Sequence, residues 1–212
     1  MKLLSVNVAQ PKTVSINGRT YDTGIYKSAV AGSVSLNKLN LAGDGQGDLK
    51  NHGGEYQAVY CYPYEHYAYW ASELAGDDFA FGHFGENFTT QGLLENEVCI
   101  GDTFGIGNAV VQVTQPRVPC YKLADKLGIT GFEATFLRAN RSGFYLSVLE
   151  EGDVKAGDSI ALLSKNAIGM SVAEVNAALY LDKQPIQAER ARRITALSPG
   201  WKRSFEQLLA KS

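Results

Sequence analysis

The chain has 212 residues, of which 45% are hydrophobic and 20% charged, the ordinary balance of a soluble globular protein. The net charge of −2 argues against a broad nucleic-acid-binding surface. No apolar run approaches the ~20 residues of a membrane span, and the apolar stretch at the N-terminus ends too early for a signal-peptide core. We therefore expect a cytoplasmic protein with no stable association with membranes or nucleic acids.

Short strands are expected over the first 60 residues. Glycine occurs 22 times, mostly between short apolar runs, and this spacing predicts many tight turns and a β-rich body. Residues 13–16 and 19–22 flank Asn17-Gly18, a strong short-range signal of a β-hairpin. Further strands are expected at residues 2–8, 34–41 and 58–62.

Helices and strands alternate in the middle of the chain. Pro63 is followed by apolar residues at helical spacing as far as Leu74, which predicts a helix of about three turns. Strands are expected again over residues 84–113. Gly-Asp pairs at 101–102 and 157–158 each precede an apolar strand, which suits the corner of a β-barrel. Two helices, at 121–127 and 132–139, and a strand at 144–149 complete this part.

The hydrophobic pattern becomes helical at about residue 165. Ser171 and Glu174 have the spacing of a capping box, and Ser198-Pro199 is typical of a helix start. Charge changes at the same place: residues 1–164 carry 12 basic and 18 acidic side chains, whereas residues 165–212 carry 8 basic and 4 acidic ones. The sequence therefore predicts a β-rich domain, 1–164, and a small three-helix bundle, 165–212.

Two of the three cysteines are most simply core residues. Cys61 and Cys99 lie within apolar strand patterns, where a cysteine behaves as a small hydrophobic residue. No CxxC pair occurs, and the three histidines have no zinc-site spacing. A disulfide framework or a structural zinc site is therefore not expected.

Cys120 has different surroundings. It ends the run PRVPC, in which Pro116 and Pro119 stiffen the backbone. The residue stands at the expected start of a helix, where the backbone dipole favours an anion, and Arg117 adds positive charge. These surroundings favour a thiolate, which attacks electrophiles or binds metals; a structural loop cysteine is the alternative. A cysteine hydrolase is disfavoured because no catalytic triad order can be assigned to the histidines.

At PRVPC the chain resembles the MOSC superfamily, the domain shared with molybdenum-cofactor sulfurases and amidoxime-reducing components. HGG at 52–54, GENFTTQGL at 85–93, the GD-x-F-x-IG phrase at 101–107 and PRVPC at 116–120 occur in the order of that family. RSGFYLSVLEEGDVKAGD at 141–158 and the three-helix tail are similar to the YiiM-type subgroup. The resemblance covers the whole chain. It implies a mainly β fold, a closed antiparallel β-barrel with peripheral helices, and a cleft for the molybdenum cofactor (molybdopterin).

The resemblance also implies the site residues. Cys120 would be the catalytic residue and the protein ligand of molybdenum. The phosphate and pterin of the cofactor require cations and amide or backbone donors, for which the candidates are Lys27, Lys50, His52, Gly53, Gly54, Asn87, Arg117 and Arg141. Each candidate also has a structural alternative. His52 and Asn87 could be hydrogen-bonded loop residues, the two lysines could be solvated surface side chains, and Arg141 could pair with the acidic turn 150–153.

Two further residues or segments bear on the site. Glu86 is expected to orient neighbouring donors rather than meet a ligand. Many relatives continue the HGG motif with Pro-Asp and a basic residue, where this chain has Glu55-Tyr56-Gln57. A basic contribution from position 57 is therefore missing, which bears on the choice of substrate.

The function that the resemblance implies is a molybdenum-dependent reductase of N-hydroxylated compounds such as hydroxylaminopurine, hydroxylamines and amidoximes. The sequence has no cysteine cluster for an iron–sulfur group and no dinucleotide fingerprint in a strand–helix setting, so we expect an external electron-donor reductase as a partner. The basic tail is a candidate docking surface, with a solvated face or a homodimer contact as the alternatives.

Two other functions stay open. The first is a non-redox carrier that binds the cofactor or carries sulfur as a persulfide on Cys120. The second is an adaptor that binds nucleic acid or protein through the positive helical tail.

Overall fold

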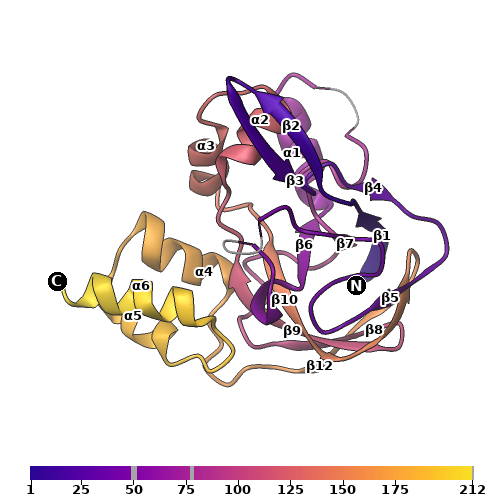
Figure 1. The fold of residues 1–212 in the computed structure, drawn as a ribbon. Helices are drawn as coiled ribbons and strands as arrows, with labels where there is room; N and C mark the ends of the chain where they lie inside the picture. The colour runs from indigo at the N-terminus through magenta and orange to yellow at the C-terminus, as the bar shows by residue number, and fades with distance from the viewer. Residues whose placement is uncertain (49–51, 77–78, 212) are drawn as a thin grey trace.

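The computed structural model describes residues 1–48, 52–76 and 79–211. The described chain is mainly β, with six α-helices placed around and beside the strands (Figure 1). One sheet contains eight strands in the order β12-β8-β9-β10-β6-β7-β1-β4. Within it β6 and β7 run parallel, and the other paired strands run antiparallel. In chain order these strands are β1 (Lys2–Val8), β4 (Ser28–Ala29), β6 (Val59–Pro63), β7 (Phe88–Gln91), β8 (Thr103–Ile106), β9 (Ala109–Pro116), β10 (Phe144–Glu150) and β12 (Ile160–Ser164).

The expected closed barrel is not confirmed, because no strand ladder among the described residues joins the two edges of this sheet. Edge strand β4 has only two residues and pairs with the end of β1, at Asn7 and Val8. The start of β1 instead approaches the turn before β12. An isolated bridge joins Lys2 to Ser159, and the Ile160 amide donates to the Met1 carbonyl at 3.0 Å. The sheet thus curls until backbone hydrogen bonds join the start of β1 to the segment before β12, without a strand ladder that closes it.

Two small sheets complete the β structure. Strands β2 (Lys12–Ile16) and β3 (Arg19–Thr23) form the predicted hairpin. Asn17 and Gly18 at its tip have φ of 53° and 74°, the left-handed conformation that an Asn-Gly hairpin turn needs. The strand expected at 34–41 is shorter, β5 (Ser33–Leu36), and pairs with β11 (Gly152–Lys155).

The helix expected after Pro63 begins two residues later than predicted. Pro63 is the last residue of β6 and pairs with Thr90 of β7, and α1 then runs over Glu65–Glu73. Helices α2 (Tyr121–Leu127) and α3 (Phe132–Arg138) follow β9, as the pattern predicts. Between α1, α2 and α3 lies an aromatic cluster that includes Trp70, Phe84 and Phe136.

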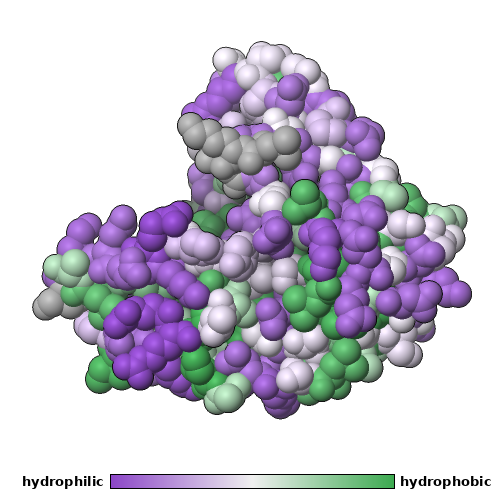
Figure 2. Space-filling view, turned by 60° about the horizontal axis from the view of Figure 1, so that its bottom comes forward, coloured by the Kyte–Doolittle hydropathy of each residue, from purple (hydrophilic) through white to green (hydrophobic). Residues whose placement is uncertain are grey.

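The C-terminal segment is helical, as expected. It comprises α4 (Val172–Asn176), a π-helical turn η2 (Ala177–Leu181), α5 (Pro185–Arg192) and α6 (Pro199–Leu209). The capping box is present: the Glu174 amide donates to Ser171 Oγ at 3.1 Å, and the Ser171 amide donates to the Glu174 carboxylate at 2.7 Å. These helices form a lobe to one side of the sheet (Figure 1), and hydrophilic side chains cover much of its surface (Figure 2). Among the described residues, no helix has the length and apolar character needed to cross a membrane.

Candidate functional site

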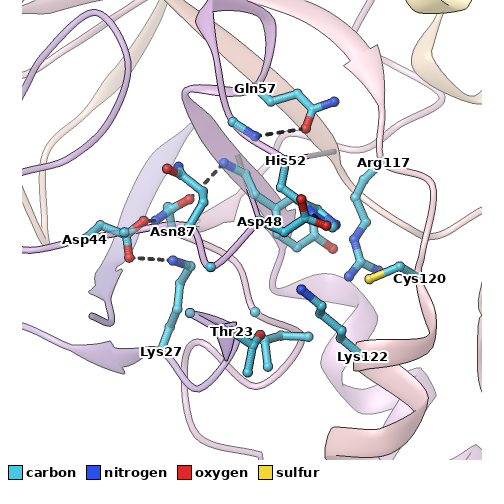
Figure 3. A pocket seen from close by; sticks show the side chains of 18 of the residues that line it. Thr23, Lys27, Asp44, Asp48, His52, Gln57, Asn87, Arg117, Cys120 and Lys122 are labelled. Atoms are coloured by element: carbon cyan, nitrogen blue, oxygen red, sulfur yellow. Dashed lines mark hydrogen bonds and ion pairs between the residues drawn. The ribbon is translucent and has the colours of Figure 1, made fainter. Parts of the chain in front are cut away.

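A pocket of about 690 Å³, open to solvent, lies where the loop after β9 meets the hairpin and the glycine-rich loop at 43–48. Figure 3 shows its side chains, which converge from segments far apart in the sequence. Six predicted residues line it, namely Lys27, His52, Gly53, Asn87, Arg117 and Cys120. Position 57, which the sequence analysis singled out for its missing basic residue, lines the pocket as Gln57. Further lining residues that sequence reasoning did not single out include Thr23, Asp44, Asp48, Tyr60, Lys122 and Tyr145.

Cys120 is the N-cap residue of α2, with an extended backbone, and its side chain faces the pocket beside Arg117 (Figure 3). Burial, the largest single influence, acts to raise the pKa of its thiol. The side-chain interaction with His52 and the positive charge of Arg117 together outweigh burial and lower the pKa of Cys120 to about 7. The thiolate form is therefore well populated at neutral pH, which is the form that binds a soft metal.

Arg117 is a buried cation of the site, with 5% of its surface exposed. Its amide donates to the Gly143 carbonyl at 3.0 Å, and its guanidinium lies over the rings of Tyr60 and Phe136, at 5.0 and 5.5 Å from their centroids. Nη1 of Arg117 is buried without a hydrogen-bond partner among the residues that the structure describes. An unpaired buried cation is costly, so this nitrogen is suited to an anionic or carbonyl group of a ligand.

Lys122 is a second cation in the pocket that the sequence analysis missed. It lies in the first turn of α2, is mostly buried, and its Nζ donates to the Asp22 carbonyl at 3.1 Å. No carboxylate pairs with it among the described ion pairs. Lys122 comes two residues after Cys120, at the start of α2, and its side chain faces the same pocket as the Cys120 sulfur (Figure 3).

Lys27 is held by a carboxylate rather than left free. Its Nζ lies 2.5 Å from Asp44 Oδ1, and burial lowers the pKa of Lys27, an effect that Asp44 opposes. The amide of Asn87 donates to the other oxygen of Asp44 at 2.8 Å, and the Tyr60 amide donates to Asn87 Oδ1 at 3.1 Å. Asn87 therefore fixes Asp44 and strand β6, as its structural alternative proposes, while it also lines the pocket.

The glycine-rich loop at 43–48 forms one wall of the pocket. A Cβ on Gly45 would lie 2.6 Å from the Pro11 ring, and one on Gly47 would lie 2.4 Å from the Asp22 backbone. Only glycine fits such close approaches. The density of glycines with two aspartates was the signal that could have placed this loop at the site.

The remaining predicted residues lie elsewhere or outside the described chain. Lys50 falls outside the described residues. Gly54 has φ of 80° just before the short helix η1 (Glu55–Gln57) but does not line the pocket. Arg141 also lies away from the pocket: its guanidinium is stacked over Tyr69, at 4.5 Å from the ring centroid, and its Nη1 is 3.4 Å from His66 Nδ1.

Glu86 is fully buried and does not line the pocket. Its carboxylate accepts hydrogen bonds from the amides of Gly82 and Phe84, at 2.9 and 3.0 Å, and from the hydroxyl groups of Tyr67 and Thr89. Burial raises the pKa of Glu86, which these hydrogen bonds oppose. The carboxylate thus orders neighbouring donors, as expected.

In chemical terms, the pocket offers one low-pKa thiol, two cations without a carboxylate partner and a histidine. Among the described residues, no cluster of three or more histidine, cysteine, aspartate or glutamate side chains is placed to hold a metal ion. A metal in this pocket would therefore need ligands that the described side chains do not supply.

Comparisons with known proteins show the family of the chain. The MOSC domain model matches residues 48–161, and the model of the YiiM-like, 3-alpha helix domain matches residues 170–212. YflK of Bacillus subtilis (strain 168) is 44% identical over 96% of this chain and 92% of its own. The crystal structure of YiiM from Geobacillus stearothermophilus superimposes with a TM-score of 0.84, with 34% identity and 98% of each chain covered. A protein of Gibberella moniliformis (strain M3125 / FGSC 7600) named "Reductase" is 32% identical over 77% of this chain, which is 29% of that protein. The chain belongs to the MOSC-domain family and, with its C-terminal helices, to the YiiM-like members of that family.

Proposed function

We propose that this protein binds a molybdenum cofactor, with Cys120 as the protein ligand of the metal, and reduces N-hydroxylated compounds. Three features support the proposal. MOSC domains are associated with molybdenum-cofactor binding, the chain matches that domain, and a relative is named a reductase. The observation that carries it is the pairing, in one pocket, of a thiol of pKa about 7 with a buried guanidinium nitrogen that has no partner.

The residues present fit such a cofactor. The described side chains provide no cluster that would hold a metal by itself. A molybdopterin brings two sulfur ligands of its own, so the protein would need to add only a single thiolate. Its phosphate and pterin carbonyl need donors, and Arg117 Nη1 is buried and unpartnered. Lys122 adds a second ammonium without a carboxylate partner. Lys27 is a weaker candidate because Asp44 already neutralises it.

The reaction that we propose converts R–NH–OH, two electrons and two protons into R–NH₂ and water. When bound, the cofactor supplies the two-electron redox chemistry of this conversion. Cys120 would hold the metal in the pocket as a thiolate, the form that His52 and Arg117 stabilise. Arg117 and Lys122 would orient anionic or carbonyl groups. The ring of Tyr60 lies beneath the Arg117 guanidinium, and Tyr145 also lines the pocket. An external reductase delivers the electrons.

The test combines metal analysis with turnover. The protein is produced in a host that makes the cofactor, its molybdenum content is measured, and reduction of benzamidoxime and hydroxylaminopurine is followed with reduced methyl viologen. Wild-type protein is expected to hold about one molybdenum per chain and to turn over both substrates. Cys120→Ser is expected to lose both properties, because serine does not supply a soft anionic ligand.

A matched control makes the result specific. Cys99→Ser makes the same change at a thiol whose pKa burial raises, and it is expected to retain metal and activity. Turnover by Cys120→Ser would remove the metal-ligand role. Wild-type protein that holds molybdenum but never reduces either substrate would favour the carrier function instead, for which a low-pKa thiol is equally suited.

A further inference from the structure

The β2–β3 hairpin lies beside α2 (Figure 1) and borders the Cys120 pocket. Among the described strands, β2 and β3 pair only with each other, and most of their residues are half-buried or exposed. The end of β3 and the two residues after it, Thr23, Gly24 and Ile25, line the pocket. A two-stranded hairpin has little stability of its own, so its contacts with other elements decide where it lies.

The base of the hairpin is packed tightly against the glycine-rich loop at 43–48. The Gly45 amide donates to the Ala9 carbonyl at 3.0 Å, and the Ala9 amide donates to Asp44 Oδ1 at 2.8 Å. A Cβ on Gly24 would lie only 2.2 Å from the Gly45 carbonyl oxygen. Backbone contacts as close as these fix the base in place.

The tip of the hairpin is held by side chains of α2. The Asp125 carboxylate accepts hydrogen bonds from Asn17 Nδ2 at 3.2 Å and from the Tyr21 hydroxyl at 2.9 Å. The ring of Tyr21 packs edge-on against Tyr121, with 5.3 Å between the centroids, and the Arg19 guanidinium lies 5.2 Å from the Tyr121 centroid. We call the two hydrogen bonds to Asp125 the latch.

Lys122 connects the hairpin to the pocket. Its Nζ donates to the Asp22 carbonyl at 3.1 Å, and its side chain lines the pocket. Lys122 and Asp125 are three residues apart on α2, so they lie on the same face of that helix. Since α2 begins directly after Cys120, the helix that holds the hairpin also starts at the reactive thiol.

The two attachments of the hairpin differ in kind. Backbone groups in close contact hold the base, whereas side chains near the surface hold the tip: Asn17 is exposed, and Tyr21 and Asp125 are half-buried. Hydrogen bonds and cation–π contacts at the surface are individually weak. The tip should therefore separate from α2 before the base separates from the glycine-rich loop.

We propose that the β2–β3 hairpin is a lid on the Cys120 pocket, hinged at the glycine-rich loop and latched to α2 through Asp125. With the latch closed, small molecules reach Cys120 through the open side of the pocket. Release of the latch lets the hairpin swing away from α2 and admits a bulky ligand, a gating role that lids have in many enzymes. The inference goes beyond the proposed function, because it applies to any bulky ligand of this pocket.

The test measures access to the Cys120 thiol in protein without bound cofactor. Labelling rates with a small reagent, N-ethylmaleimide, and a bulky one, fluorescein maleimide, are followed by mass spectrometry of the Cys120 peptide. Both reagents attack through the same group and react with the thiolate, so the ratio of the two rates is insensitive to a change in the pKa of the thiol.

Two latch variants and one control are compared. Tyr21→Phe removes one hydrogen bond of the latch, and Asp125→Ala removes both. The control Ser15→Ala removes an exposed hydroxyl that pairs with Thr20 inside the hairpin at 2.8 Å. It leaves the latch intact. Thermal unfolding midpoints close to that of wild type show that each variant keeps its fold.

In wild-type protein, the bulky reagent is expected to be about tenfold or more slower relative to the small one than it is with glutathione. Tyr21→Phe should recover part of this difference and Asp125→Ala most of it, whereas Ser15→Ala should keep the wild-type ratio. A wild-type ratio equal to that of glutathione, latch variants that keep the wild-type ratio, or an equal change in Ser15→Ala would overturn the proposal. Since no step uses bound cofactor or turnover, the result is independent of the proposed function.

Discussion

At the scale of single residues, Cys120 and Cys99 show how surroundings decide the chemistry of a thiol. Both are partly buried. Burial raises the pKa of Cys99, and the nearby Asp102 raises it further. At Cys120 burial acts in the same direction, but His52 and Arg117 reverse the result. Reactivity therefore follows the sign of the neighbouring charge rather than exposure.

This difference predicts the pH dependence of alkylation in protein without bound cofactor. Because the folded pKa of Cys120 is about 7, its reaction with iodoacetamide should reach half its maximal rate near pH 7, followed by mass spectrometry of the labelled peptide. His52→Ala should move that midpoint upward, since one of the interactions that lower the pKa is removed. Cys99 in the same sample serves as the control and should label slowly at neutral pH. A Cys120 midpoint at or above that of an ordinary thiol would contradict this account of the site.

The residues of the site could be predicted only in part. Cys120 and Arg117 stand in one short motif, so their chemistry is visible in the sequence. Lys122 gives no such signal, because nothing in the sequence distinguishes it from the other lysines; only the orientation of α2 places its side chain at the pocket. Arg141 was a candidate for the cofactor because of its positive charge, whereas the structure stacks it on Tyr69. Proximity in space, which a single sequence does not record, accounts for both differences.

At the scale of elements, the segment before β10 supports the backbone of Arg117 through hydrogen bonds. The carbonyls of Arg141 and Ser142 accept hydrogen bonds from the hydroxyl groups of Tyr62 and Tyr60, at 3.0 and 2.7 Å. The Gly143 amide donates to Glu95 Oε1 at 2.8 Å, and the Gly143 carbonyl accepts from the Arg117 amide. Segment 141–143 therefore links Glu95 to the backbone of Arg117.

Removing the Glu95 carboxylate should loosen this segment. Glu95 also lies 2.6 Å from His66 Nε2, and both side chains are buried, so Glu95→Ala leaves two buried partners unsatisfied. We expect a loss of about 2 to 4 kcal/mol in the free energy of unfolding, measured with urea. Glu95→Gln should lose less, because its amide oxygen can still accept from Gly143.

Exposed Glu97, two residues away, provides the control, and Glu97→Ala should leave the free energy of unfolding nearly unchanged. If the Arg117 backbone depends on this link, molybdenum content should also be lower in Glu95→Ala than in Glu97→Ala. Equal stability of the two alanine variants would show that segment 141–143 is held by its tyrosine contacts alone.

Local signals predicted most elements, and the arrangement of the sheet was less accessible. The Asn17-Gly18 turn and the capping box of α4 depend on neighbouring residues and formed as expected. Closure of the barrel depends on the length of β4 and on which end of β1 it pairs with. No local sequence pattern predicts that pairing. The closed barrel was expected from the family resemblance alone, whereas the described strands form an open sheet.

At the scale of the whole molecule, the C-terminal helices share one apolar core with the sheet. Buried Val98 and Ile100, beside the sheet, belong to the same cluster as Val172, Trp201 and Phe205. The backbone crosses the boundary too. The Ile100 amide donates to the Met170 carbonyl at 3.0 Å, and the Val172 amide donates to the Val98 carbonyl at 2.9 Å. The change of composition near residue 165 thus marks a change of element type without a break in the core.

A continuous core predicts that the chain unfolds as one cooperative unit. Differential scanning calorimetry of the full chain should show a single transition with equal calorimetric and van't Hoff enthalpies. A fragment ending at residue 164 would expose Val98 and Ile100, which the C-terminal helices now cover. That fragment should bind the dye ANS and unfold at a lower temperature. Two separate transitions in the full chain, with the fragment melting at the temperature of one of them, would mean that the contacts between sheet and helices contribute little.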